Sequence, residues 1–497
     1  MNFSKSTFVL ILLFLITLLL RSFFALLVFG TNDTEAWLIL SKIINCGYKL
    51  HTSIRYPYPP FWEIFLLALY PLETIIRVPF YYLIKIPPII ADGFIIIFIY
   101  LISLQQNITR KSALFRSLFY TISTVSILIT SFHGQFDSIT ILFVLIAIYY
   151  LQLVNKYNLL ISAFFLGLSA VTKPWTVILI PLFIFKIKSN QNRIVYLSVA
   201  FGVILLSLAP YLIIDSKSFI RDVFFYSSTR DFGLAVLLDY FSINNVKYLE
   251  SINLFLKANS GQFGKLLLIS GLLINYFWVF KNKTSLLNSI VITLLVFYSL
   301  STGIGAQYLF WVLPFLLVSN MFWTKFYSVF AAFAIMASYY WHNTNAFTII
   351  LNPGFLNRGS YILPWGISVV GWWVICLGIL IWYVLNSKQS KTTILRNYTS
   401  YKNQFIILLI VLSLSFSLLL SFPKLTILLY GKSLQNYYVD ELITTNCNLH
   451  EIGQRSVFTD RIQELVENEK RTNSFSLITI LLILTLLSIF IPEGKRK

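Results

Sequence analysis

The sequence predicts an all-α protein, namely a polytopic transmembrane helical bundle with about 14 spans. Its composition is the first reason: 57% of the 497 residues are hydrophobic, only 11% are charged, and the mean hydropathy is +0.77. Soluble domains carry about 25% charged residues, so a soluble enzyme of this length is excluded. The apolar runs are also continuous rather than alternating, and in lipid this favours helices over a barrel.

The spans are placed on the longest apolar runs, several of which are short for a bilayer. They cover residues 7–29, 83–104, 114–132, 137–154, 157–172, 174–187, 194–214, 263–280, 285–302, 307–320, 325–341, 363–386, 404–422 and 475–492.

These spans divide the chain into four parts. Residues 1–345 form a membrane module with long loops on one side, and 346–422 add further spans. Residues 423–474 are a polar, mildly acidic excursion, and 475–497 hold the last span and a basic tail.

The orientation follows from Lys and Arg, which collect in alternate short loops such as 110–116, 186–193, 281–283 and 388–402. The positive-inside rule places these loops and both termini in the cytosol. All 19 acidic residues except Asp92 and Glu493 then fall on the opposite, outer side. We expect an integral protein of a prokaryotic plasma membrane or a eukaryotic endoplasmic reticulum, with its active surface outside the cytosol. The net charge of +19 reflects the cytosolic loops, so no nucleic-acid partner is expected.

Two ionisable residues lie inside predicted spans, where charge is costly. Arg21 either snorkels to the interface or pairs with another helix. Asp92 should face the bundle interior, either in a structural hydrogen bond or in a direct functional role.

The first outer loop, 30–82, opens with Gly-Thr-Asn-Asp-Thr-Glu directly after the first span. Trp37, Leu40 and Ile44 share one helical face just beyond it, which predicts an interfacial helix lying on the membrane. Asp33 has two interpretations. It is either an N-cap of that helix or a general base at the membrane boundary.

A second polar motif, His133-Gly-Gln135-Phe-Asp137-Ser, lies at the outer junction of the third and fourth spans. His133 and Asp137 share a face if this turn is helical. The motif is either a hydrogen-bonded helix hairpin or a sugar site. Two candidate ligands fall short of a metal site, so no cofactor is expected and a divalent metal is the lesser alternative.

Two more polar sites reach the same boundary. Lys173, between two short spans, is either an ordinary snorkelling lysine or a phosphate contact. Gln307 and Tyr308 accompany glycines and aromatic residues that are also typical of an interfacial belt.

Of the three cysteines, Cys376 lies in a span, whereas Cys46 and Cys447 map to the outer side. A disulfide between the latter two is one alternative, although spacing alone does not establish pairing. Loop 215–262, with Arg221 and Asp222, is a candidate cover for the outer cavity.

The order and common sidedness of these motifs resemble the glycosyltransferase C superfamily over roughly residues 1–345, and within it the polyprenyl-phosphate-mannose-dependent mannosyltransferases. The resemblance implies transfer of a hexose, most often mannose, from a polyprenyl-phosphate donor to a lipid-linked glycan or protein acceptor. By match to the first-loop acid, Asp33 would be the base and Glu35 an assistant. His133, Gln135, Asp137, Lys173, Gln307 and Tyr308 would bind the donor phosphate or sugar. A paired Asp-Asp motif, common in the superfamily, is absent from the first loop.

Three other classes fit parts of the pattern. A polysaccharide polymerase or ligase would use outer arginines and a lipid diphosphate. A polytopic transporter of a glycolipid or small solute predicts intramembrane charge partners and an internal repeat. A non-catalytic assembly subunit needs no site at all.

Overall fold

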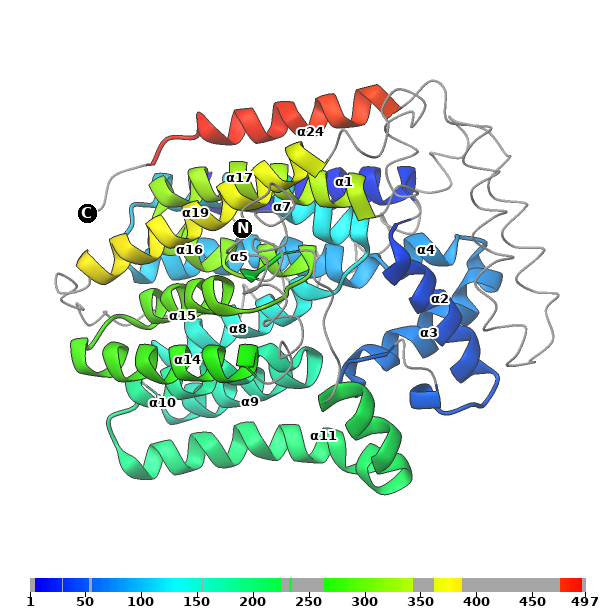
Figure 1. The fold of residues 1–497 in the computed structure, drawn as a ribbon, viewed down its shortest axis with the longest axis horizontal. Helices are drawn as coiled ribbons and strands as arrows, with labels where there is room; N and C mark the ends of the chain where they lie inside the picture. Colours follow the sequence, from blue (N-terminus) through cyan, green and yellow to red (C-terminus); the bar gives the residue numbers. More distant parts are fainter. Residues whose placement is uncertain are drawn as a thin grey trace, which may run out of the picture.

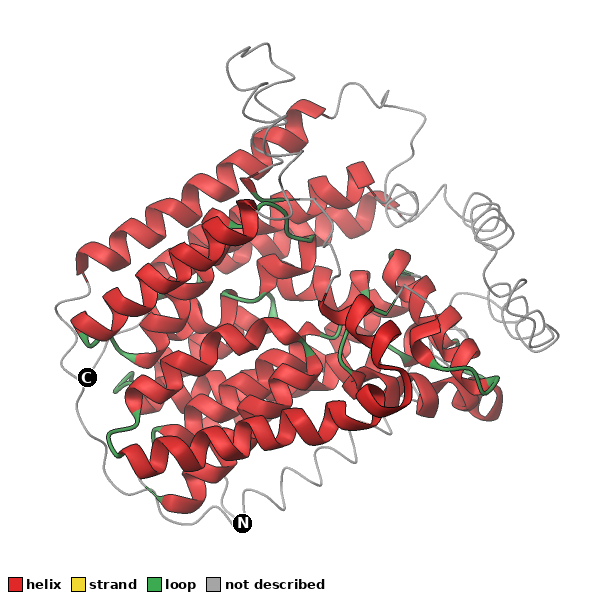
Figure 2. Ribbon diagram, turned by 60° about the horizontal axis from the view of Figure 1, so that its bottom comes forward, coloured by secondary structure: helices red, strands yellow, loops and turns green. Residues whose placement is uncertain are grey.

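The computed structural model describes residues 5–28, 30–52, 56–153, 155–224, 232–234, 263–342, 362–386 and 474–493. Within these ranges the regular structure is helical, and an isolated bridge joins Phe232 to Ile304 (Figure 2). The predicted all-α class is confirmed for this part of the chain.

The described part of the chain forms a succession of α-helices and shorter helical turns. Their bounds are α1 Lys5–Leu27, α2 Asn32–Asn45, η1 Leu50–Thr52, η2 Pro60–Trp62, α3 Glu63–Ile76, α4 Phe80–Leu83, α5 Ile86–Gln105, α6 Arg110–Thr121, α7 Thr124–Ile127, η3 Leu128–His133, α8 Asp137–Leu151, α9 Lys156–Thr172, η4 Pro174–Leu179, α10 Ile180–Lys186, α11 Asn190–Phe224, α14 Phe263–Asn282, α15 Leu286–Leu300, η5 Ala306–Phe310, α16 Leu313–Ser319, α17 Met321–His342, α19 Ile362–Asn386 and α24 Ser474–Ile489.

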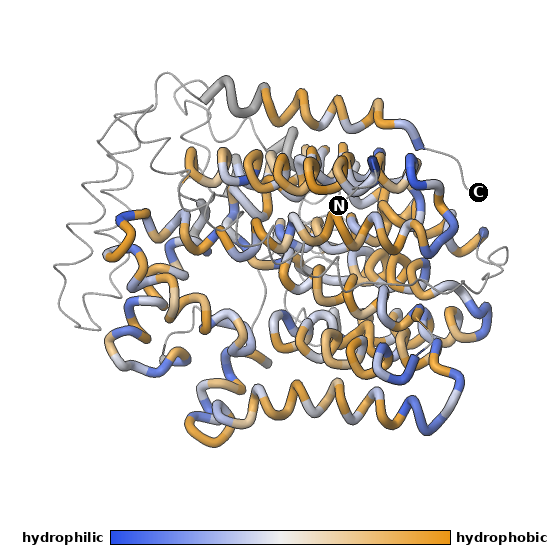
Figure 3. Tube along the Cα trace, turned by 180° about the vertical axis from the view of Figure 1, so that it is seen from behind, coloured by the Kyte–Doolittle hydropathy of each residue, from blue (hydrophilic) through white to orange (hydrophobic). Residues whose placement is uncertain are grey.

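Most of these helices run side by side in a bundle, and α2, α3 and α4 form a separate group beyond one end of it (Figure 1). Apolar residues predominate along the helices, while hydrophilic residues collect where the chain turns at their ends (Figure 3). Close packing is visible at Gly167 on α9, where an added Cβ would lie 2.6 Å from the Ala200 carbonyl oxygen of α11.

Every predicted span coincides with a described helix or a run of short helices, except 404–422, which lies outside the described residues. Among the described helices, 7 are long and apolar enough to cross a membrane, including Lys5–Leu27, Phe80–Gln105 and Arg110–His133. The remaining apolar helices are 10–17 residues long. Within the described residues, seven helices therefore meet the length that a bilayer requires, and the predicted count of about 14 spans is not confirmed. The segment 423–473 also lies outside the described residues.

The expected interfacial helix exists as α2, but its apolar face is covered by protein. Trp37, Leu40 and Ile44 are all buried, with exposed fractions of 1%, 0% and 8%. The exposed apolar residues of this end lie instead on the neighbouring helix α3, where Ile64 and Ile75 are 61% and 72% exposed. A shared helical face could not reveal whether protein or lipid would cover it.

Arg21 and Asp92 form a buried ion pair between α1 and α5, with 2.5 Å between Nε and Oδ2 and no exposed surface on either side chain. The guanidinium also donates to the Thr121 carbonyl oxygen at 2.9 Å. Tyr120 and Ser138 donate to Asp92 Oδ1 at 2.6 and 2.8 Å. Arg21 therefore pairs with another helix and does not snorkel, and Asp92 has the structural role.

The cysteines behave partly as expected. Cys46 is disulfide-bonded, and Cys376 is a buried free thiol. The other expected partner, Cys447, lies outside the described residues.

The buried Glu73 on α3 makes the stability of the α2–α4 group depend on pH. The residue is 4% exposed, and burial raises its pKa to about 7 even though the Phe80 backbone N–H donates to it. In the unfolded chain the pKa would be near the ordinary 4.5. The folded state therefore binds the proton more tightly, so stability is highest below about pH 4.5 and falls by about 3 kcal/mol as pH rises through 7.

We expect the melting temperature in detergent to fall between pH 5 and pH 8, and Glu73→Gln to flatten this part of the profile. Glutamine keeps the acceptor for Phe80 and removes the titration. An equal fall in the variant would assign the pH dependence to other groups.

Candidate active site

The chain turns sharply between α1 and α2, and this turn presents Asp33. Thr31 is the N-cap of α2, because its hydroxyl accepts the Asp33 backbone N–H at 3.3 Å. Asp33 thus lies in the first helical turn, with its carboxylate free to face another segment. The interpretation of Asp33 as the cap is wrong.

The facing segment is the turn from His133 to Asp137. It follows η3, a single π-type turn, a local distortion that occurs frequently at functional sites. Gly134 then adopts a φ of +75°, and an added Cβ would lie 2.5 Å from the Thr34 hydroxyl oxygen. This left-handed, crowded position favours glycine. Because Gly134 ends the helical geometry, His133 and Asp137 do not share a face.

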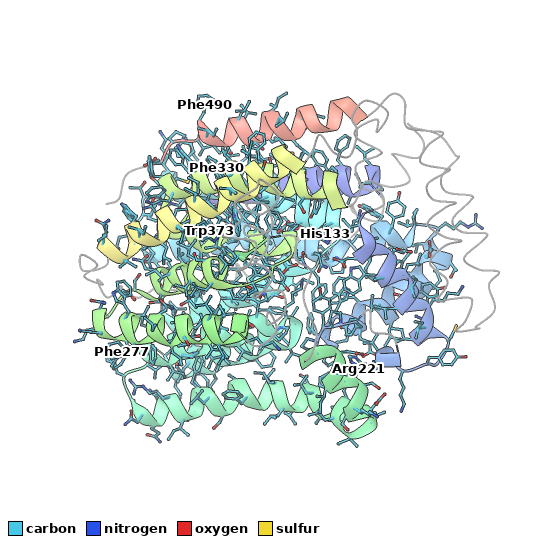
Figure 4. All side chains as sticks on the ribbon, in the orientation of Figure 1. His133, Arg221, Phe277, Phe330, Trp373 and Phe490 are labelled. Carbon is cyan, nitrogen blue, oxygen red and sulfur yellow. The ribbon has the colours of Figure 1, made fainter. Side chains whose placement is uncertain are left out.

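Three hydrogen bonds connect the start of helix α2 to this turn. The Thr31 and Thr34 hydroxyls both donate to the His133 carbonyl oxygen at 3.2 Å. The Trp37 indole N–H donates to the Gly134 carbonyl oxygen, also at 3.2 Å. These bonds fix two segments about a hundred residues apart in the sequence, and Figure 4 shows His133 where the bundle faces the α2–α4 group.

Asp33 is held through one carboxylate oxygen. Its Oδ2 lies 2.6 Å from His133 Nε2 and also accepts the Gln135 side-chain amide. Oδ1 accepts no hydrogen bond from the described residues, and 34% of the side chain is exposed. Burial raises the pKa of Asp33, but the hydrogen bond and charge of His133, with Gln135 and Lys173, outweigh it and hold the pKa below its ordinary value. The carboxylate is therefore ionised, oriented and open on one side.

Gln135 connects Asp33 to a second ion pair. Lys173 Nζ donates to Gln135 Oε1 at 2.9 Å and to Asp137 Oδ2 at 2.7 Å. A lysine can only donate and a carboxylate can only accept, so the Gln135 amide orientation is fixed chemically. Trp311 donates its indole N–H to Asp137 Oδ1 at 2.6 Å, which satisfies both oxygens.

Lys173 is therefore a buried and paired lysine. It is 2% exposed, and its ammonium also lies over the rings of Phe136 and Tyr58, 4.5 and 4.9 Å from their centroids. Ordinary snorkelling is wrong for this residue. Its visible role is to hold Gln135, and hence Asp33, in place.

Three stacked aromatic rings lie next to Asp137. The Trp311 ring stacks on Trp175 at 4.2 Å and on Tyr308 at 4.0 Å between centroids. Gln307, next to Tyr308, is 9% exposed and makes no side-chain hydrogen bond within the described ranges. Its amide therefore retains unused hydrogen-bonding capacity.

The structure brings Asp33, His133, Gln135, Asp137 and Lys173 into one hydrogen-bonded chain and places Tyr308 at its end. Glu35 is buried on α2 at 7% exposure. Within the described residues, no group of three or more His, Cys, Asp or Glu could hold a metal ion.

Two members of the site cannot be recognised from the sequence. Trp311 is indistinguishable in sequence from the residues of an aromatic belt. Tyr339 lies inside a predicted span, and its hydroxyl is 2.6 Å from His133 Nδ1. Its identification requires the packing of α17 against η3.

Comparison with known proteins adds one similarity. Over 244 residues, the chain is 24% identical to GPI mannosyltransferase 1 of Candida albicans, in a match that covers 44% of this chain and 58% of that protein. The chain thus spans a little over half the length of this relative. The similarity, with the apolar helices, supports a mannosyltransferase-like glycosyltransferase in a membrane. No model of a known protein family matches the chain.

Proposed function

We propose that this protein transfers a hexose, most often mannose, from a polyprenyl-phosphate donor to a lipid-linked glycan or protein acceptor. The proposal rests on one observation, namely how the two carboxylate oxygens of Asp33 are hydrogen-bonded and exposed. One carboxylate oxygen is fixed by two donors and the other is open, on a half-buried acid at the end of a membrane bundle. A general base for a hydroxyl nucleophile needs this arrangement.

In the proposed reaction, the acceptor hydroxyl oxygen attacks the anomeric carbon of the donor sugar. Asp33 Oδ1 takes the hydroxyl proton as the new C–O bond forms. The bond between the anomeric carbon and the phosphate oxygen breaks, and polyprenyl monophosphate leaves. One displacement inverts the anomeric configuration, so a β-linked donor gives an α-linked product.

The donor-binding residues divide into two groups under this proposal. Gln307 and Tyr308 have an amide and a ring available for the sugar or phosphate. Lys173 and Asp137 already satisfy each other, so they act on the donor mainly by positioning Gln135 and Trp311. Holding donor and acceptor together supplies much of the rate.

We further propose that the site faces the non-cytosolic side and that both termini are cytosolic, since basic loops collect at the opposite helix ends. Single cysteines at Arg77 and at Lys188, both exposed, provide a test. In oriented vesicles, an impermeant thiol reagent should label Arg77→Cys and leave Lys188→Cys unlabelled. Equal labelling would contradict the orientation.

The activity is tested with the full chain in lipid nanodiscs. The radiolabelled donors are polyprenyl-phosphate-mannose, polyprenyl-phosphate-glucose and a polyprenyl-diphosphate sugar, with a lipid extract as the acceptor source. We expect transfer from one monophosphate donor. Transfer only from a lipid diphosphate sugar would indicate a polymerase or ligase. Uptake into sealed vesicles without transfer would indicate a transporter. The Arg21–Asp92 pair is an intramembrane charge pair of the kind that a transporter predicts, but it is fully buried and its members satisfy each other.

A further inference from the structure

Two turns far apart in the sequence meet at one end of the bundle, namely the turn from α10 to α11 and the turn from α14 to α15 (Figure 1). Lys186 Nζ donates to the Thr284 carbonyl oxygen, which joins residues 98 positions apart. The rings of Phe185 and Phe280 lie beside this bond, with 5.3 Å between their centroids. Together the two turns carry five cations, which we call the basic cluster: Lys186, Lys188, Arg193, Lys281 and Lys283.

No carboxylate neutralises the basic cluster within the described ranges, because none of the ion pairs there includes a member of it. Lys186 and Arg193 donate to the main-chain carbonyl oxygens of Thr284 and Ile187, which carry no net charge. The other three side chains are exposed. The positive-inside bias accounts for cations at these helix ends. It does not account for two distant turns that bring theirs together, where like charges repel one another.

The backbone of Lys283 is in a conformation that suits glycine better than lysine. Its φ is +50°, in the left-handed region. Its N–H donates to the Phe280 carbonyl oxygen at 3.3 Å, and the Thr284 N–H donates to the Val279 carbonyl oxygen at 3.4 Å. These two bonds end α14 in a Schellman motif, in which glycine is the usual left-handed residue. A side chain there costs free energy, and this one is exposed, so packing does not explain it. The outlier points to a role for the lysine charge.

Exposed apolar side chains adjoin the basic cluster on both helices. Ile194, directly after Arg193, is 65% exposed, and Phe277 and Phe280, in the turn before Lys281, are 69% and 59% exposed. Figure 4 shows Phe277 at this end of the bundle, away from His133. Cations beside apolar surface match a phospholipid, whose phosphate adjoins its acyl chains. A soluble anion would use the cations and leave the apolar surface uncovered.

We propose that the basic cluster binds the headgroup of an anionic phospholipid, whose acyl chains lie along the exposed apolar residues of α11 and α14. Lysine and arginine bind phosphate oxygens by charge-assisted hydrogen bonds, and basic clusters at the ends of membrane helices attract anionic headgroups. This lipid site is separate from Asp33 and does not depend on the proposed transfer reaction.

Lys283→Gly is the sharpest variant, because it removes the charge and supplies the residue that the backbone prefers. The full chain is purified in detergent and titrated with phosphatidylglycerol or phosphatidylcholine of the same acyl chains. Bound lipid is counted by native mass spectrometry, and the melting temperature is followed in parallel. We expect the wild type to retain phosphatidylglycerol selectively. In phosphatidylcholine the variant should melt no lower than the wild type.

The affinity for phosphatidylglycerol should fall about fivefold in Lys283→Gly and about thirtyfold when Lys281→Gln is added, at the usual contribution of a lysine near an anionic surface. An unchanged affinity in the double variant would overturn the proposal. Equal retention of phosphatidylcholine by the wild type would also overturn it, since charge would then have no part in binding.

Lys111→Gln is the matched control. Lys111 is also exposed and lies in the first turn of α6, a helix that packs against α1 and α5. We expect it to bind phosphatidylglycerol as the wild type does. A loss equal to that of Lys283→Gly would show that the lipid responds to net charge and not to a site. A further arm uses inorganic phosphate alone. If phosphate raised the melting temperature as much as the lipid, the site would be one for a soluble anion, and the lipid assignment would be wrong.

Discussion

Asp33→Asn is expected to lower kcat by about 10²- to 10⁴-fold, the usual contribution of a general base. Asparagine keeps the size of the side chain and can still accept from His133 and Gln135, so the turn should stay folded. It cannot take the acceptor proton. The measurement is transfer from labelled polyprenyl-phosphate-mannose in nanodiscs, with donor affinity followed separately.

Asp215→Asn is the matched control for this change. Asp215 lies at the kink of α11, where its carboxylate accepts the Ser218 backbone N–H, and among the described residues no hydrogen bond joins it to the Asp33–Lys173 chain. We expect near-normal activity from this variant. Full transfer by Asp33→Asn, or a larger loss in Glu35→Gln than in Asp33→Asn, would contradict the assignment of the base to Asp33.

The pH dependence of the wild type gives a further check on Asp33. Because its pKa lies below the ordinary value, Asp33 is already ionised at mildly acidic pH. Activity that depends on its carboxylate is therefore present above that pKa and is lost only as pH falls through it. A wild-type acid limb between pH 5.5 and 7 would point to another group.

Asp92→Asn is expected to destabilise the protein by about 3–5 kcal/mol, because it leaves the Arg21 guanidinium buried without a counter-charge. Arg21→Met should cost a similar amount by stranding the carboxylate. The double variant should cost clearly less than the sum, since neither charge is then left alone. The measurement is a double-mutant cycle on the free energy of unfolding in mixed micelles.

Asn275→Ala is the control that measures how much an uncharged hydrogen bond between helices contributes to stability. Asn275 on α14 donates to the Thr293 hydroxyl of α15 at 2.7 Å in an equally buried setting. Neutral bonds of this kind within membranes contribute about 0.6 kcal/mol. If Asp92→Asn cost no more than this control, the ion pair would not be a main source of stability.

The sequence predicted the helical class and the position of nearly all described helices, because long apolar runs have few alternatives in lipid. It does not settle how many of these helices cross the membrane. Segments 157–172 and 174–187 are short already in the sequence, and the break between them falls where η4 begins at Pro174. Apolar composition shows that a segment is buried, and it does not show whether protein or lipid surrounds it.

The polar residues of the candidate site could be chosen from the sequence. Asp33, His133, Gln135, Asp137, Lys173 and Tyr308 stand out there because polar groups are expensive within apolar helices. Their contacts with one another depend on the tertiary structure. It made Thr31 rather than Asp33 the helix cap, paired Lys173 with Asp137, and brought Tyr339 from α17 against His133. The reason is physical: a residue's chemistry is local, whereas its partner is chosen by packing between helices far apart in the chain.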